Sequence, residues 1–220
     1  MSAVGKFFPA VFSNPKVNPA TNNFPVTAAE RTHRTGHAGI VVWFTGLSGA
    51  GKTTLARAVE RQLWDAGHRT FLLDGDLLRT DLCADLGFSA ADRQENVRRA
   101  AGVARLMAQA GLICLTALIS PFRADRLRAR NAMVVGSFVE VFVNAPLAVC
   151  EQRDPKSLYR RARAGQLPEF TGISSPYEPP DSPEIEVRTD LFSVQVCTEK
   201  IIAALTQRGH LLPPSACEQQ

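Results

Sequence analysis

The chain of 220 residues lacks the features that mark several large classes of protein. It has no uninterrupted apolar run of the roughly 18 residues that a membrane-spanning helix needs. Its five cysteines are odd in number, widely spaced and without a Cys-x-x-Cys pair, which argues against a disulfide framework or a zinc site. We therefore expect reduced thiols in a cytoplasmic protein. The four histidines show no metal-ligand spacing, and no Ser-His-Asp or Cys-His arrangement is suggested.

The charge balance is slightly basic, with a formal net charge of +4. No run of five or more like charges forms a nucleic-acid-binding tail, and no groove-reading motif is present. A site for small polyanions explains the excess of positive charge equally well. We expect neither a nucleic acid nor a membrane as partner.

The most informative segment is a complete phosphate-binding P-loop, Gly46-Leu-Ser-Gly-Ala-Gly-Lys-Thr53, between an apolar run and a helix-like stretch. Its glycines allow backbone N–H groups to turn toward phosphates, the lysine reaches the β/γ oxygens, and the threonine hydroxyl can hold Mg²⁺. The segment predicts binding of ATP with Mg²⁺. The expected ATP-binding residues here are Gly46, Leu47, Ser48, Gly49, Ala50, Gly51, Lys52, Thr53 and Thr54.

Strand-like and helix-like patterns alternate along the chain, which predicts an α/β fold with a mostly parallel sheet covered on both faces. The expected strands are 40–45, 70–73, 112–119, 138–143 and 184–187. The expected helices are 54–66, a Ser89-capped helix through 110, one from 147 and one over 191–207. We expect one domain over residues 38–208, an N-terminal extension without sustained periodicity over 1–37, and a C-terminal tail over 209–220.

Two carboxylates, Asp74 and Asp76, follow the second expected strand, which we take to be buried and away from the sheet edges. Ligands of open α/β sheets bind at the carboxyl ends of strands. A phosphotransferase needs one carboxylate near Mg²⁺ and often one near the accepting hydroxyl. We assign Asp74 with Thr53 to the metal, partly through water, and Asp76 to the acceptor. Asp-Gly-Asp can also be a simple turn, but the P-loop upstream favours the functional interpretation.

The arginines separate into several groups. Those between Arg123 and Arg130 recur every two or three residues and predict a polar, solvated helix surface. Arg79 and Arg93 flank an apolar turn, where they could fork onto an anion while Phe88 stacks on a base. The segment 153–163 carries five cations before a glycine-containing loop, which predicts a basic lid over phosphates, although an ordinary exposed loop fits nearly as well.

Several blocks together resemble the adenylylsulfate kinase family, in its order, from about Asn18 to Leu205. They are Phe44 to Thr54, Leu72 to Asp76, Asp85 to Ser89, Asp92 to Asn96, Ile119 to Arg123, Cys150 to Lys156, Ala162 to Gly165, Phe170 to Ile173 and Pro176 to Pro180.

The resemblance implies a three-layer fold like that of P-loop nucleoside kinases with a basic lid. It also implies a homodimer and ATP-dependent phosphorylation of the 3′-hydroxyl of adenosine 5′-phosphosulfate (APS) to 3′-phosphoadenosine 5′-phosphosulfate (PAPS). Arg153 would lie by the adenine of ATP. The implied APS residues are Asp76, Arg79, Phe88, Arg93, Asn96, Ile119, Ser120, Lys156 and Phe170.

The implied catalytic residues are Lys52, Asp76 and Ser120. Ser120 occupies a position sometimes described as a phosphoserine intermediate, but direct in-line transfer needs no such species, so we treat Ser120 first as a substrate-site residue. The chain departs from the family pattern at Leu77, which stands for Asn, at Thr80-Asp81, which stands for His-Gly, and at Ser157, which stands for Gly.

Two alternatives remain. A P-loop kinase for another small hydroxyl acceptor would have no reason to keep Phe88, Arg93, Asn96 and Phe170 together. A non-catalytic nucleotide-binding regulator would be expected to lose Lys52, Thr53 or Asp76, all of which are present.

Overall fold

A computed structural model describes residues 26–211 of the chain. Its elements in chain order are α1 (Ala28–Thr35), β1 (Ile40–Thr45), α2 (Lys52–Asp65), β2 (Thr70–Asp74), α3 (Gly75–Thr80), α4 (Ala90–Gln109), β3 (Ile113–Ala117), α5 (Arg123–Asn131), β4 (Phe138–Asn144), α6 (Leu147–Arg153), α7 (Leu158–Arg163), β5 (Ile185–Arg188) and α8 (Val194–Gln207). Within the same residues, no helix combines the length and apolar composition needed to cross a membrane.

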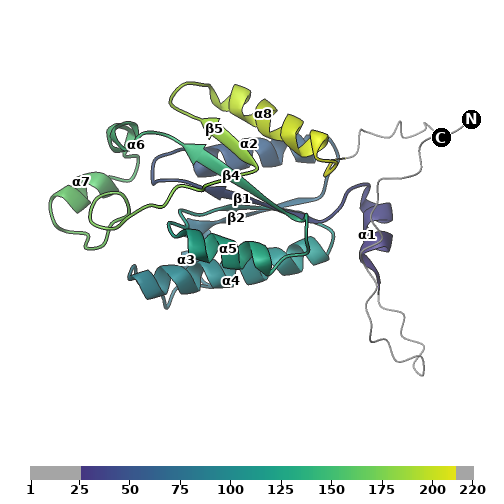
Figure 1. The fold of residues 1–220 in the computed structure, drawn as a ribbon, viewed down its shortest axis with the longest axis horizontal. Coiled ribbons are helices and arrows are strands. Elements are labelled where there is room, and N and C mark those ends of the chain that lie inside the picture. The colour runs from purple at the N-terminus through teal and green to yellow at the C-terminus, as the bar shows by residue number, and fades with distance from the viewer. Residues whose placement is uncertain (1–25, 212–220) are drawn as a thin grey trace, which may run out of the picture.

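The five strands form one parallel sheet in the order β2-β3-β1-β4-β5. Helices α2 and α8 cover one face, and α3, α4 and α5 cover the other (Figure 1). The carboxyl ends of all strands meet at one edge, where α6 and α7 also lie, while α1 lies at the opposite end of the molecule (Figure 1). The predicted three-layer α/β fold with a parallel sheet is therefore confirmed.

The core follows from the two-sided burial of the central strand. All six residues of β1 are buried, and alternate side chains enter different clusters. Val42 and Phe44 pack with apolar residues of α2 and α8, whereas Val41 and Trp43 pack with those of α4. Because successive side chains of a strand point to opposite faces, a continuous apolar run is what a strand needs when both its faces are covered.

Most predicted elements are present with boundaries shifted by a few residues. The long helix begins after Ser89, and the reciprocal bonds between Ser89 and Asp92 form the expected capping box. The third strand ends at Ala117, two residues short of the expected end, and the last helix begins after the N-cap Ser193. The segment 176–183 has no regular structure, as its prolines predicted.

The N-terminal extension contains a helix that its lack of periodicity did not predict. Helix α1 begins after Thr27, whose side chain and that of Glu30 form a capping box, and it ends at the left-handed Gly36. None of its residues is buried, so local capping rather than an apolar face defines this helix. The remaining parts of the expected extension and tail, residues 1–25 and 212–220, lie outside the described residues.

Strand β2 was expected to be buried away from the sheet edges, and this prediction was wrong. It pairs only with β3 and forms an edge of the sheet, and Phe71 in it is 43% exposed. Its apolar composition reflects the helices on its two faces. Composition of this kind does not specify whether a further strand lies alongside.

The prediction of a solvated surface for Arg123–Arg130 was also wrong in part. These arginines do lie on a helix, α5, but Arg126 is 3% exposed and forms an ion pair of 2.7 Å with Glu140 of β4. Arg130 pairs with Glu184 at 2.7 Å. The local spacing of cations could not reveal these acidic partners, because they follow much later in the sequence.

A buried histidine joins the segment after α1 to the domain. The Nε2 atom of His37 accepts a hydrogen bond from the N–H of Arg69 at 3.0 Å, and Nδ1 lies 3.1 Å from the carbonyl of Ala38. This pairing requires a neutral ring with its proton on Nδ1. Burial lowers the pKa of His37, and burial also lowers the pKa of its neighbour His68.

We predict that the protein loses stability as the pH falls through about 6.5, the ordinary histidine value. Below that pH the unfolded chain binds a proton at His37 more readily than the folded chain does, so protonation favours unfolding. Urea unfolding at pH 7.5 and 5.5 measures the effect. In a His37→Gln variant the difference between the two midpoints should become smaller, and an unchanged difference would exclude His37 as its source.

Candidate active site

The P-loop connects β1 to α2 and is stabilised by its own lysine. The Nζ atom of Lys52 donates hydrogen bonds to the carbonyls of Gly46 at 3.0 Å and Leu47 at 2.7 Å. Gly49 has a φ of +73°, and a Cβ there would lie 2.8 Å from the carbonyl oxygen of Cys150. Glycine is therefore needed at this position for two reasons, the left-handed backbone and the close approach of α6.

Lys52 is almost completely buried, at 9% exposure. Burial lowers its pKa to about 8, because a charged ammonium is less stable away from water. A bound polyphosphate would favour the charged form. The loop thus holds a cation next to the N-terminus of α2, where backbone N–H groups also attract anions.

Three side chains from other parts of the chain hold the loop, and two of them, Tyr159 and Thr189, were not predicted from the sequence. The hydroxyl of Tyr159 in α7 donates to the carbonyl of Ser48 at 2.9 Å, and that of Thr189 donates to the carbonyl of Ala50 at 2.8 Å. Arg153, expected near adenine, donates to the loop carbonyl of Gly49 at 3.4 Å and to the carbonyl of Thr189 at 2.6 Å. No local motif marks Tyr159 or Thr189, since each acts across more than 100 residues of sequence.

The two expected carboxylates lie at the carboxyl end of β2. Asp74 is the N-cap of the short helix α3, and its Oδ1 accepts from the N–H of Asp76 at 3.0 Å. Its second oxygen lies 3.8 Å from the guanidinium of Arg57. The side chain of Asp76 is 70% exposed and forms an ion pair with Lys156 of the lid. The structure therefore brings into contact two residues of the expected acceptor site, one after β2 and one between α6 and α7.

Contacts link several of the residues expected to bind the acceptor. The guanidinium carbon of Arg79 lies 4.4 Å from the ring centroid of Phe88, which is 61% exposed. Arg93 contacts the hydroxyl of Thr171 and the carbonyl of Glu169, which places α4 against the loop that carries Phe170. An exposed ring beside two guanidinium groups is suited to an anionic nucleotide.

Asn96 lies on the buried side of α4, at 7% exposure. Its Nδ2 has no hydrogen-bond partner among residues 26–211. A buried amide donor without a partner is unfavourable, because it has given up its hydrogen bonds to water.

Ser120 lies after β3 and is 3% exposed. Its Oγ accepts a hydrogen bond from Trp43 Nε1 at 3.1 Å and donates to Thr45 Oγ1 at 3.0 Å. The preceding carbonyl, that of Ile119, accepts from the same threonine at 2.8 Å. The Ser120 hydroxyl therefore both accepts and donates a hydrogen bond inside the protein.

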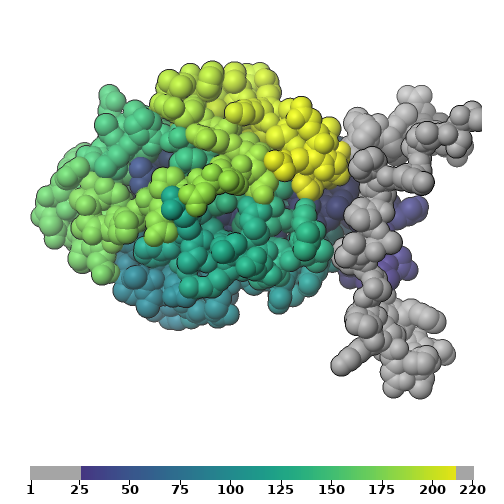
Figure 2. All heavy atoms as spheres, in the orientation of Figure 1, coloured from purple at the N-terminus to yellow at the C-terminus, as the bar shows by residue number. Residues whose placement is uncertain are grey.

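The segment 153–163, which was predicted to be a basic lid, runs from the end of α6 through α7. Figure 2 shows these green segments forming the end of the molecule. Ser157, between the two helices, has a φ of +54°, a left-handed conformation that favours glycine. Its side chain makes the backbone stiffer at this junction than the glycine of the family pattern would.

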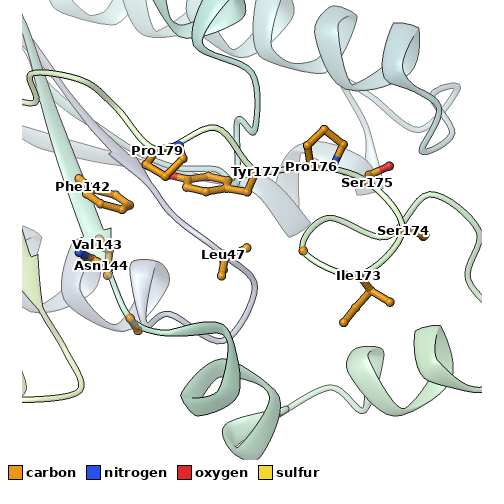
Figure 3. A pocket seen from close by; sticks show the side chains of 12 residues that line it. Leu47, Phe142, Val143, Asn144, Ile173, Ser174, Ser175, Pro176, Tyr177 and Pro179 are labelled. Atoms are coloured by element: carbon orange, nitrogen blue, oxygen red, sulfur yellow. The ribbon is translucent and has the colours of Figure 1, made fainter.

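A cavity of about 560 Å³ lies beside the P-loop on the β4 side (Figure 3). Its lining comprises Leu47, Phe142, Val143, Asn144, Ala145, Gly172, Ile173, Ser174, Ser175, Pro176, Tyr177 and Pro179. It contains none of the expected catalytic residues. The site is therefore defined by the charged side chains at the edge of the sheet and not by this cavity.

A P-loop at the end of the central strand, carboxylates after a second strand and a basic lid define the class of P-loop kinases. The model of the adenylylsulphate kinase family matches residues 38–188, and the chain belongs to that family.

Three known proteins illustrate the similarity. An adenylyl-sulfate kinase of Acaryochloris marina is 54% identical over 191 residues, which cover 87% of this chain and 93% of that protein. The structure of the Mycobacterium tuberculosis APS kinase CysC in complex with AMPPNP and APS has a TM-score of 0.73 and 46% identity, covering 77% of this chain and 99% of that one. A hexameric APS kinase from Thiobacillus denitrificans has a TM-score of 0.62 and 35% identity, covering 84% of this chain and 32% of that one.

We predict that Tyr159→Phe weakens ATP binding about fivefold, since a lost hydrogen bond is worth roughly 1 kcal/mol and the Ser48 carbonyl would turn freely. Calorimetric titration with ATP measures the affinity. The aromatic ring still packs edge-to-face on Phe170 at 5.1 Å in this variant, so stability should change little. Tyr159→Leu, which loses both contacts, serves as the comparison. Equal ATP affinity in wild type and Tyr159→Phe would contradict the assigned role.

Proposed function

We propose that the protein transfers the γ-phosphoryl group of ATP to the 3′-hydroxyl of APS, which yields PAPS and ADP in sulfate activation. Family membership supports the proposal. The observation that carries it is the gathering of Lys52, Asp76, Arg79 and Phe88 at one edge of the sheet, in a chain that keeps the complete P-loop. One end of this site is suited to a polyphosphate, and the other to an anionic nucleotide acceptor.

In this mechanism the protein contributes positioning and charge rather than covalent chemistry. Lys52 leaves the carbonyls of its own loop to contact the β/γ oxygens, and N–H groups at the start of α2 hold the phosphates. Asp76 leaves Lys156 and orients or deprotonates the 3′-hydroxyl, while Lys156 moves to an anionic group of the acceptor. Arg79 and Arg93 bind the acceptor's negative charge, Phe88 and Phe170 enclose its base, and Asn96 donates its free N–H to it.

Mg²⁺ is the expected cofactor, and the donor set fits it. Within residues 26–211 no three His, Cys, Asp or Glu side chains form a metal cluster. Mg²⁺ in kinases takes most of its ligands from phosphates and water and one or two from the protein. Thr53 and Asp74 offer oxygen atoms of the required kind. The ion, when bound with ATP, would neutralise charge that develops on the phosphates.

Ser120 is proposed as a structural part of the acceptor site and not as a phosphorylated intermediate. Its hydroxyl lies among Trp43 and Thr45 and is almost fully buried. A phosphoryl group there would place charge inside the protein and remove the hydrogen that Ser120 donates to Thr45.

The experiment that tests the function is release of ADP by the purified protein with Mg-ATP, with and without APS. We expect release to require both APS and Lys52, with Lys52→Ala as control. ATP binding without APS-dependent release would favour the non-catalytic regulator. Release stimulated by a different hydroxyl compound would favour the alternative kinase.

Asp76→Asn should lower kcat about 100-fold or more, because a general base contributes roughly that factor, while ATP affinity stays nearly unchanged. The substitution keeps the shape of the side chain and removes its charge. Steady-state kinetics with APS, beside calorimetric titration with ATP, separates the two effects. A fully active variant would remove Asp76 from the chemistry.

We also propose a homodimer and a cytoplasmic location, both on family resemblance. The four cysteines within residues 26–211 are free and buried, which is compatible with a reducing compartment. Light scattering on the purified protein should give the mass of two chains. The mass of one chain or of six would contradict the dimer.

A further inference from the structure

Arg126 lies at the centre of a buried hydrogen-bond network outside the P-loop. Its Nε donates to Glu140 Oε1, its Nη1 to the carbonyl of Ser120 and its Nη2 to the carbonyl of Glu178, each at 2.7 Å. The side chain is 3% exposed. A planar guanidinium holds its donors in fixed, diverging directions, which lets one residue bind three separate segments.

The first of these segments contains a strained turn. Ser120 has a φ of +41°, which a residue with a side chain rarely adopts. Such a conformation persists only when the surroundings hold it. Arg126 holds the carbonyl of this residue, while Trp43 and Thr45 hold its hydroxyl.

The second segment runs from Tyr177 to Pro179 and forms a wall of the cavity in Figure 3. The N–H of Glu178 donates to the carbonyl of Pro121 at 2.9 Å. The hydroxyl of Tyr177 lies 3.0 Å from that of Thr45, the last residue before the P-loop. Three parts of the chain therefore meet at one place: the turn at Ser120, the end of β1 and the segment from Tyr177 to Pro179.

We propose that Arg126 is a positioning residue for the acceptor side of the active site. By fixing the carbonyls of Ser120 and Glu178, it sets the orientation of the Ile119–Ser120 turn and of the segment that continues from the Phe170 loop. It acts through these backbones and does not contact the reacting atoms. The inference rests on the proposed function, since it identifies the acceptor as the substrate that is affected.

Arg130 provides a matched control. It belongs to the same ion-pair cluster as Arg126 but does not hold the carbonyls of Ser120 and Glu178. It lies on α5 one turn after Arg126, pairs with Glu184 at 2.7 Å and approaches Glu140 at 3.5 Å. It donates to neither Ser120 nor Glu178 among the contacts of the described residues. A purely structural role of the cluster would make the two arginines equivalent in kinetics.

The test compares Arg126→Lys with Arg130→Gln in steady-state kinetics with both substrates. Lysine keeps the charge opposite Glu140 but replaces three donors of fixed direction with one ammonium. We expect the KM for APS to rise about tenfold or more in Arg126→Lys, as expected from loss of one or two hydrogen bonds, with the KM for ATP within about twofold. Arg130→Gln should keep both values within about twofold. An unchanged KM for APS in Arg126→Lys, or equal effects on both substrates, would overturn the proposal.

A spectroscopic measurement keeps the test independent of the proposed activity. The chain has two tryptophans, and Trp43 is buried against Ser120 whereas Trp64 is 56% exposed. In a Trp64→Phe background, Arg126→Lys should shift the Trp43 emission to shorter wavelength, because the fully buried indole N–H loses its fixed hydrogen bond to the Ser120 hydroxyl. Arg130→Gln should shift the emission less, because Arg130 reaches Trp43 only through the ring of Phe138 and leaves the hydrogen bond to Ser120 in place.

The two readouts distinguish failure of the inference from failure of the function. If the wild type shows no APS-dependent turnover, the proposed function fails, and the Trp43 emission alone decides whether Arg126 fixes the turn. An unchanged emission overturns the positioning role in that case. If Arg126→Lys does not fold, Arg126→Gln supplies the same comparison. Failure of both variants to fold, with Arg130→Gln folded, would mark Arg126 as structural and would overturn the proposal.

Discussion

The parallel pairing of β1 between β3 and β4 is the constraint on which the rest of the structure depends. It brings the carboxyl ends of strands that are far apart in the sequence to one edge, and the functional groups follow those ends. The P-loop follows β1, Asp74 ends β2, Ser120 follows β3 and the lid follows β4. A parallel sheet requires a crossover between strands. Helices α2, α4 and α5 lie in crossovers and cover the faces of the sheet, whereas the crossover from β4 to β5 carries α6 and α7 at the carboxyl edge. The same connections that build the core therefore assemble the site.

At the P-loop, the cost of burying polar backbone is offset by hydrogen bonds from several elements. Carbonyls of the loop accept from Lys52, Tyr159 and Thr189, so several elements of the fold hold the loop in its shape. A buried ammonium is unfavourable on its own, which is why burial lowers the pKa of Lys52. The binding of phosphate relieves that penalty, because it gives the cation an opposite charge. Two features of the P-loop thus favour an anionic ligand. Hydrogen bonds hold the loop in a fixed shape, and the buried charge of Lys52 gains an opposite charge when the ligand binds.

Sequence reasoning succeeded where the determining interactions are local, and it was incomplete where they are distant. The P-loop, the Ser89 capping box and the strand–helix alternation depend on residues close together in the chain, and all are present. The capping box of α1, between Thr27 and Glu30, is equally local, so the sequence could have predicted this helix as well. The edge position of β2 depends on strand order, and the burial of Arg126 depends on Glu140 and Glu178, so neither is visible in a local pattern. The roles of individual site residues remain predictions, although contacts join Asp76 to Lys156 and Arg79 to Phe88.

The contact between Asp76 and Lys156 links the carboxylate proposed to face the acceptor to the segment proposed as a lid, and this interaction is weak enough to exchange. Both side chains are more than half exposed, and ion pairs of this kind contribute only about 0.2–1 kcal/mol. An anionic acceptor with several charged oxygens would offer Lys156 a stronger partner and leave Asp76 free for the hydroxyl. The adjoining Ser157, held at positive φ, limits the backbone freedom of the lid at the same point. A lid that is restrained by its backbone but attached by a weak ion pair can release Asp76 with little movement, which is what alignment of an acceptor hydroxyl requires.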